Sequence, residues 1–116
     1  MKHERTYRWA DPTEIMAAAQ GQSGLDLMRA MAEGRVPPPP VGSLIGVNGF
    51  TAEKGKITMG FDPAEFHYNP IGMVHGGIAC TLLDSAMSCA VYASLPVGMA
   101  FTTLQLNVNL NRPISL

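Results

Sequence analysis

The sequence contains little charge of either sign. Lysine and arginine together number 8 and aspartate and glutamate 9, so charged residues make up 15% of the 116 and the formal net charge is −1. A surface that binds nucleic acid concentrates lysine and arginine on one face, and the sequence has no such basic cluster. We therefore expect no nucleic-acid partner.

Cysteine is also scarce. Cys80 and Cys89 are the two cysteines, and their spacing on one predicted helix places them on opposite sides, too far apart for a disulfide. Reduced thiols are typical of the cytoplasm. The N-terminal residues 1–9 carry charges of both signs and no apolar run, which argues against a signal peptide or membrane anchor. We expect a cytoplasmic protein.

Metal ligands and a membrane span are two further features that the sequence does not indicate. No group of histidine, cysteine and carboxylate residues has metal-ligand spacing, so we expect no metal or other cofactor. The apolar run 76–95 contains one charge, Asp84, and Pro96 ends it. A carboxylate near the middle of a membrane span costs about 2.5–3.5 kcal/mol. We therefore expect no membrane partner, and a helix buried on nearly all sides.

The first 40 residues predict a helical segment followed by a proline linker. A helix is expected over 11–20, because Asp11 is a favoured N-cap residue. A second helix is expected to follow Ser23, which can cap it in the same way. The four prolines of 37–40 then predict a stiff extended connector.

Residues 41–116 predict one α+β domain. Strands are expected over 44–52 and 56–61, joined by a hairpin turn at 53–55. A long helix should begin near His75 and end before Pro96. A third strand is expected from Phe101 to Arg112, because leucine and valine there alternate strictly with glutamine and asparagine.

One stretch indicates a reaction site: Asn69, then His75-Gly76-Gly77, then Asp84. Two glycines at the start of an apolar helix leave backbone N–H groups uncovered, and such groups attract developing negative charge. Asp84 is an isolated acid in that helix, which contains no lysine or arginine to pair with it. We therefore favour a functional role for Asp84.

This pattern of an asparagine, a His-Gly-Gly and an acid nine residues after the histidine resembles the hotdog-fold acyl-CoA thioesterases of the phenylacetate-degradation type. The resemblance covers roughly residues 23–114 and is specific over 68–84. It implies a hotdog fold, in which an antiparallel sheet wraps around a long central helix. It also implies hydrolysis of acyl-CoA to free acid and coenzyme A.

The resemblance also implies roles for four residues. Asp84 would be the nucleophile or general base, and Gly76 would donate its backbone N–H to the oxyanion. Asn69 and His75 would position substrate or water around the carbonyl. Each residue has a structural alternative, since Asn69 could initiate a turn, His75 could fix its loop, and the glycines could serve close packing. Asp84 could be a structural buried acid, but that would need a partner.

Thr103 matches a family position that often holds serine or threonine and helps to place the water. Side-chain parity puts Thr103 on the face of Gln105, so Thr102 remains an alternative. With Gly77, Thr102 is a candidate for substrate binding.

Spacing along the helix predicts a shared site. Asp84 lies eight residues after Gly76, which is about 12 Å along a helix axis. One chain cannot place both groups around one thioester carbon, whereas two chains with antiparallel helices can. We expect a homodimer, and the resemblance implies the same composite site and often a dimer of dimers.

Hotdog domains continue with further antiparallel strands, and the sequence ends at Leu116 where those strands should begin. We therefore expect a C-terminally truncated product whose last strand has an unpaired edge. Two other functions remain open: an enoyl-thioester hydratase or dehydratase of the same fold, and a non-catalytic acyl-CoA-binding module.

Overall fold

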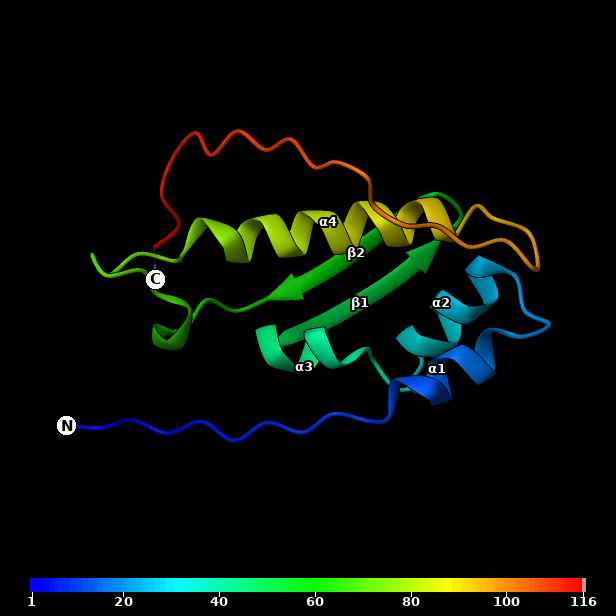
Figure 1. Ribbon diagram of the computed structural model, residues 1–116, viewed down its shortest axis with the longest axis horizontal. Coiled ribbons are helices and arrows are strands. Elements are labelled where there is room, and N and C mark those ends of the chain that lie inside the picture. The colour runs from blue at the N-terminus through cyan, green and yellow to red at the C-terminus, as the bar shows by residue number, and fades with distance from the viewer. Residues whose placement is uncertain (116) are drawn as a thin grey trace.

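A long helix packed along a β-hairpin dominates the computed structural model, which describes residues 1–115 (Figure 1). Two short helices lie at one end of the hairpin and a third lies beside the start of its first strand. The α+β class predicted from the sequence is confirmed. The elements are α1 Pro12–Ala19, α2 Gly24–Ala32, α3 Pro40–Ile45, β1 Val47–Glu53, β2 Lys56–Phe61, the 3₁₀ turn η1 Glu65–His67, and α4 Gly76–Tyr92.

The two N-terminal helices begin where their capping residues predicted. The Thr13 N–H donates to the Asp11 carboxylate at 2.9 Å, and this bond lowers the pKa of Asp11. The Asp26 N–H donates to Ser23 Oγ at 3.2 Å. Each bond satisfies a backbone donor that the first turn of a helix leaves free.

Helix α3 corrects the sequence prediction, which placed a strand from residue 44. Residues 40–45 are helical, and the strand begins only at Val47. Pro40 is suited to the first helical position because its missing N–H would have no partner there. Gly46 ends the helix with a φ of 92°, a left-handed conformation that favours glycine. The extended proline spacer is therefore shorter than predicted.

The predicted hairpin is confirmed. Strands β1 and β2 pair antiparallel and Glu53 is opposite Lys56, so that only Lys54 and Gly55 form the turn. Gly55 has a φ of 71°, which suits such a tight connection. The pairing register shifts between Val47 and Gly49 at the far end of the hairpin.

Helix α4 has the predicted position but not the predicted burial. His75 is its N-cap, yet none of its residues is buried, and Leu83, Met87 and Val91 are 43%, 51% and 52% exposed. The reason is that α4 packs against β2 on one side only, so the two-stranded sheet covers little of it. Within residues 1–115, no helix is both long enough and apolar enough to cross a bilayer.

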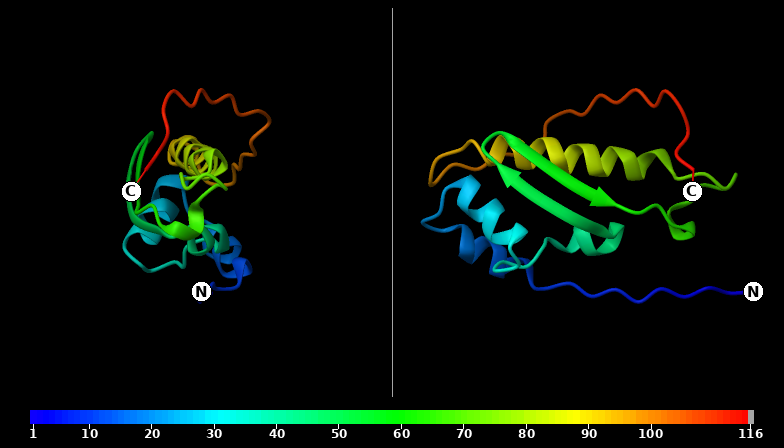
Figure 2. Two further views of the ribbon diagram at one scale, coloured as in Figure 1. Left: turned by 90° about the vertical axis from the view of Figure 1, so that its left-hand side faces the viewer. Right: turned by 180° about the vertical axis from the view of Figure 1, so that it is seen from behind.

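The prediction of a strand over 101–112 is wrong, because that segment forms no ladder with any part of residues 1–115. It passes along α4 on the side away from the hairpin (Figure 2). Helix α4 thus separates it from β1 and β2, and a strand needs a partner backbone within hydrogen-bonding distance. The end of the segment returns to the start of α4, where the Val74 N–H donates to Ile114 O at 3.1 Å.

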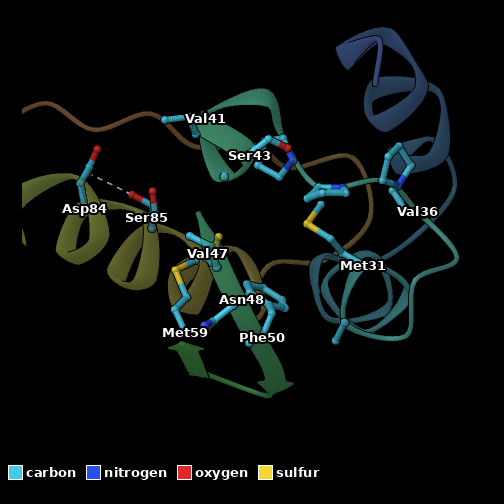
Figure 3. Close-up of a pocket in the computed structure, with 18 of the residues that line it drawn as sticks. Met31, Val36, Val41, Ser43, Val47, Asn48, Phe50, Met59, Asp84 and Ser85 are labelled. Atoms are coloured by element: carbon cyan, nitrogen blue, oxygen red, sulfur yellow. Dashed lines mark hydrogen bonds between the residues drawn. The ribbon is translucent and has the colours of Figure 1, made fainter. Parts of the chain in front are cut away.

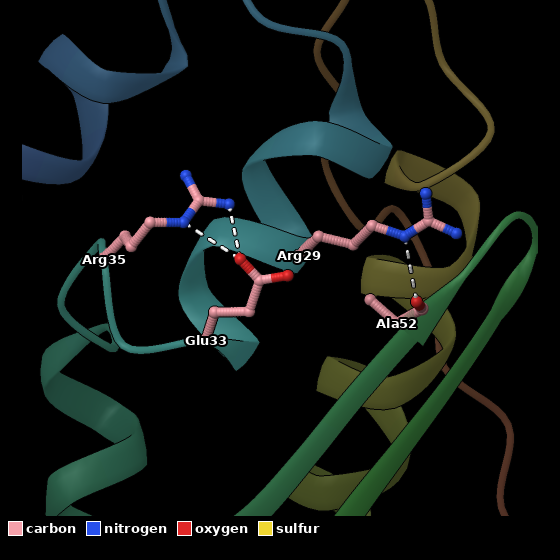
Figure 4. A network of polar contacts seen from close by, with 4 residues as sticks. All are labelled: Arg29, Glu33, Arg35 and Ala52. Carbon is pink, nitrogen blue, oxygen red and sulfur yellow. Dashed lines mark hydrogen bonds and ion pairs between the residues drawn. The ribbon is translucent and has the colours of Figure 1, made fainter.

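The buried core joins α2 to the C-terminal end of α4. Gly24 begins α2 so close to α4 that a Cβ there would lie 1.7 Å from Tyr92 O, so only glycine fits. Arg29 extends from α2 to Ala52 O on β1 at 3.5 Å, and the neighbouring Glu33–Arg35 pair is exposed (Figure 4). The buried residues of this core are Leu27, Met28, Ala30, Val36 and Ala93.

Candidate active site

Asp84 lies near the middle of α4 in a cluster of three oxygen-bearing side chains. Its Oδ1 accepts hydrogen bonds from Thr103 Oγ1 at 2.7 Å and from Ser88 Oγ at 3.4 Å, and the two hydroxyl oxygens are 3.2 Å apart. No donor to the other carboxylate oxygen, Oδ2, occurs within residues 1–115. One oxygen of Asp84 is therefore held in place while the other is open to a water or a substrate.

The sequence explains how both hydroxyl groups reach Asp84. Ser88 follows four residues later on the same helix, so it lies on the same face one turn away. Thr103 comes from the segment after α4, which reverses at Gly98 with a φ of 85°. Of the two threonines considered from the sequence, Thr103 rather than Thr102 contacts the carboxylate.

A cavity of about 770 Å³ adjoins the Asp84 cluster. It lies between α4, β1 and the proline spacer, with Asp84 at one end and Val36 at the other (Figure 3). Among the described residues that line it, Asp84 carries the only charge. Its apolar lining includes Met31, Val36, Phe50, Met59 and Phe101. This cavity suits an uncharged, apolar group next to a carboxylate.

The first turn of α4 contains a backbone donor that has no acceptor in the described part of the chain. His75 Nδ1 accepts from the Gly77 N–H at 2.9 Å, so Gly77 is occupied in capping the helix. The Gly76 N–H, in contrast, has no acceptor among residues 1–115. Because His75 Nδ1 accepts a bond, the proton of the neutral ring is on Nε2, which is left to donate elsewhere.

Gly76 is also packed closely. A Cβ added there would lie 2.6 Å from Leu110 Cδ1, the flexible end of a side chain that can shift. Gly76 therefore combines close packing, the structural alternative considered from the sequence, with an N–H that has no acceptor among residues 1–115.

Asn69 organises the loop before α4. Its Oδ1 accepts from the backbone N–H groups of Ile71 and Met73, each at 3.0 Å, and its own N–H donates to Met73 O at 2.7 Å. This is the turn-forming arrangement considered from the sequence. Within residues 1–115, the side-chain N–H₂ of Asn69 is the polar group of this residue that has no hydrogen-bond partner.

The groups predicted for one site fall into two places within one chain. Neither His75 nor Gly76 lines the cavity beside Asp84. Both Gly76 and Asp84 are on the continuous helix α4, so the separation of about 12 Å along its axis holds.

A cysteine nucleophile at this cavity is disfavoured. Cys89 lines the cavity, but its burial raises the pKa of the thiol and so lowers the thiolate fraction at neutral pH. In the part of the chain that the structure describes, no cluster of three or more His, Cys, Asp or Glu residues could hold a metal ion.

Sequence reasoning did not single out Ser88 or the proline spacer as parts of the site. Ser88 could have been found from its helical spacing to Asp84. The spacer, of which Pro37, Pro38 and Pro39 line the cavity, carries no chemical signal and is placed there by the fold.

Two comparisons bear on this site. The family model of the thioesterase superfamily matches residues 71–116, which include Gly76, Asp84 and Thr103. A crystal structure from Ralstonia eutropha JMP134, of a candidate thioesterase described as phenylacetic acid degradation-related, matches with a TM-score of 0.66 and 29% sequence identity. The likeness to thioesterases is confirmed.

The match also confirms the predicted hotdog class, since this chain has a long helix beside two antiparallel strands. The match covers 74% of this chain and 67% of the other chain. Among curated proteins, no match to this chain was found.

Proposed function

We propose that the protein hydrolyses acyl-CoA thioesters to a free acid and coenzyme A. Both comparisons support a thioester hydrolase. The observation that carries the proposal is Asp84, a carboxylate with one oxygen fixed by Thr103 and the other open beside an apolar cavity. This is the geometry that a group activating water, or attacking a carbonyl carbon itself, requires.

The chemical step uses Asp84 and a backbone donor together. Water, deprotonated by Asp84, attacks the thioester carbon, or the Asp84 carboxylate attacks it directly to form an anhydride that water then hydrolyses. In both routes the carbonyl oxygen becomes an oxyanion, which the free Gly76 N–H stabilises. The C–S bond then breaks, and the thiolate of coenzyme A leaves and takes up a proton.

Such a step needs two chains, since Gly76 and Asp84 of one chain are about 12 Å apart along α4. Two α4 helices packed antiparallel would bring Asp84 of each chain to Gly76 of the other. The exposed apolar side chains of α4, Leu83, Met87 and Val91, support a homodimer formed along this helix.

The acyl group is proposed to be apolar and uncharged. The cavity of about 770 Å³ beside Asp84 contains no described lysine, arginine or histidine that could pair with a second carboxylate on the substrate. We expect phenylacyl and medium-chain acyl groups to be preferred over succinyl or malonyl groups.

The test is release of coenzyme A, measured with a thiol reagent over a panel of acyl-CoAs. Matched N-acetylcysteamine thioesters, which lack the nucleotide, show whether the coenzyme A part is recognised. The Asp84→Asn variant is the control for background hydrolysis. Hydration of an enoyl-CoA without thiol release would instead support a hydratase, and binding without either reaction a non-catalytic module.

The two routes through Asp84 can also be separated. A single turnover in ¹⁸O-labelled water places label in the Asp84 carboxylate only if that carboxylate is the nucleophile. Label found only in the released acid would show that water attacks the acyl carbon, either of the thioester or of an anhydride, and trapping the anhydride with hydroxylamine then distinguishes the two.

A further inference from the structure

His67 is the one buried polar or charged residue in the described part of the chain, with 5% of its surface exposed. It ends η1, between β2 and α4, and its ring lies 4.7 Å from that of Phe61 and 4.4 Å from that of Phe66. Both ring nitrogens of a buried histidine need hydrogen-bond partners. The partners of His67 therefore identify the segments that it connects.

Both ring nitrogens are hydrogen-bonded. Nδ1 accepts from the Ala64 N–H at 3.0 Å, and Nε2 lies 2.6 Å from Ile45 O. A backbone N–H can only donate and a carbonyl can only accept, so Nδ1 has no proton and Nε2 carries one. The contacts therefore fix the neutral Nε2–H tautomer of His67.

The backbone of His67 holds the start of α4. The His75 N–H donates to His67 O at 2.8 Å, and the adjacent Tyr68 forms an isolated antiparallel bridge with Val74. The peptide group that follows His75 contains the Gly76 N–H. Only the φ and ψ of His75 lie between this anchored amide and the Gly76 N–H.

We propose that His67 is a positioning residue for the oxyanion donor. Its ring fixes the η1 turn to Ile45 at the end of α3, and its carbonyl fixes His75, so that the Gly76 N–H points at a set angle. The inference rests on the proposed function of Gly76. A misplacement of about 1 Å in such a group can cost about a hundredfold in rate.

The first test uses three variants of the purified protein. His67→Phe keeps the ring and removes both bonds, His67→Asn keeps an acceptor near the position of Nδ1, and His67→Gln keeps a donor near that of Nε2. We expect His67→Phe to lower kcat about tenfold or more with KM within about twofold, and Asn and Gln to restore part of the loss. Unchanged kcat in folded His67→Phe would overturn the proposal.

The second test does not use activity. Ring ¹⁵N NMR of the unmodified protein should show the Nε2–H tautomer of His67, and the Nδ1–H tautomer would contradict the proposal. In each variant that folds, hydrogen exchange at the His75 amide should accelerate while amides of the β1–β2 ladder do not change. If His67→Phe does not fold, the Asn and Gln variants decide. The proposal is overturned if both variants keep the kcat of the unmodified protein and its hydrogen-exchange rate at the His75 amide.

These readouts separate two kinds of failure. If the unmodified protein releases no coenzyme A from any thioester, the proposed function fails. The exchange measurement at His75 still decides whether His67 positions the start of α4.

Discussion

The two candidate places for chemistry on α4, its first turn and Asp84, are held by different kinds of contact. At its first turn, the His75 ring caps Gly77 two residues away, and the Gly76 N–H has no acceptor among residues 1–115. Near its middle, Asp84 is held by Thr103, which is 19 residues away and belongs to a segment without regular secondary structure. The capping bond at the first turn joins neighbours in the sequence, whereas the hydrogen bond from Thr103 that holds Asp84 comes from a distant segment.

The difference predicts which perturbations each place tolerates. The capping bond of the first turn should persist whenever α4 forms, because it needs only the local backbone, while the angle of the Gly76 N–H depends in addition on His67. The Asp84 cluster should respond to changes around Thr103 that leave α4 intact.

Asp84→Asn should have the largest effect on the middle of α4. The variant keeps the size of the side chain and a bond to Thr103, but it cannot take up a proton or attack as a carboxylate. We expect kcat to fall by about a thousandfold or more while KM stays within a few-fold, because this group acts in the chemical step. Steady-state kinetics of coenzyme A release measure both quantities. Near-normal kcat would eliminate Asp84 as the reacting group.

Gly76→Pro removes the free donor at the first turn. Proline suits the first helical position, and the preceding His75 already has the extended conformation, with a ψ of 132°, that proline favours in its neighbour. The helix should therefore form without the N–H. Loss of one oxyanion donor costs about 10²–10³ in kcat.

The matched control is Gly76→Ala, which retains the N–H. Its Cβ would meet Leu110 Cδ1 at 2.6 Å, so the double variant Gly76→Ala/Leu110→Ala relieves the contact. We expect this double variant to be far more active than Gly76→Pro. Equal losses in the two would assign the effect to packing and not to the donor.

Mixing the two inactive chains tests whether the places meet across a dimer. A heterodimer of Asp84→Asn and Gly76→Pro contains one site in which an intact Asp84 faces an intact Gly76. With equal amounts and random exchange, half the dimers are mixed and half their sites are good, so about a quarter of the normal activity should return. The measurement is activity after subunit exchange, with heterodimers shown by native mass spectrometry. Heterodimers without recovered activity would refute the shared site.

Features with local causes were the ones that the sequence predicted well. The cap of α1 at Asp11, the turn at Gly55 and the start of α4 at His75 each depend on residues within a few positions. Asp84 and Gly76 could be singled out from the sequence for a local reason as well. A charge without a partner and an uncovered backbone N–H are both unusual in an apolar helix.

Features that depend on distant partners were predicted poorly. Strand β2 and the segment 101–112 show the same period-two alternation, yet only β2 has a neighbour for its backbone and forms a strand. Alternation specifies which side chains share a face, but a ladder also needs a partner. The burial of α4 was overestimated for the same reason, because its apolar composition does not say what covers it.

Thr103→Val should have the smallest effect on the reaction, and it distinguishes the two places most sharply. The variant keeps the shape of the side chain and removes the donor at 2.7 Å from Asp84 Oδ1. A bond to a charged group contributes about 1.5–3 kcal/mol, and Ser88 can supply part of it, so we expect kcat to fall about tenfold. Exchange at the His75 amide, the marker for the first turn, should not change.

Thr102→Val is the matched control, since no bond from Thr102 to Asp84 occurs among the described residues, and its effect should be smaller. An equal loss in the two variants, or a change at His75 in Thr103→Val, would mean that the two places on α4 are not independently built.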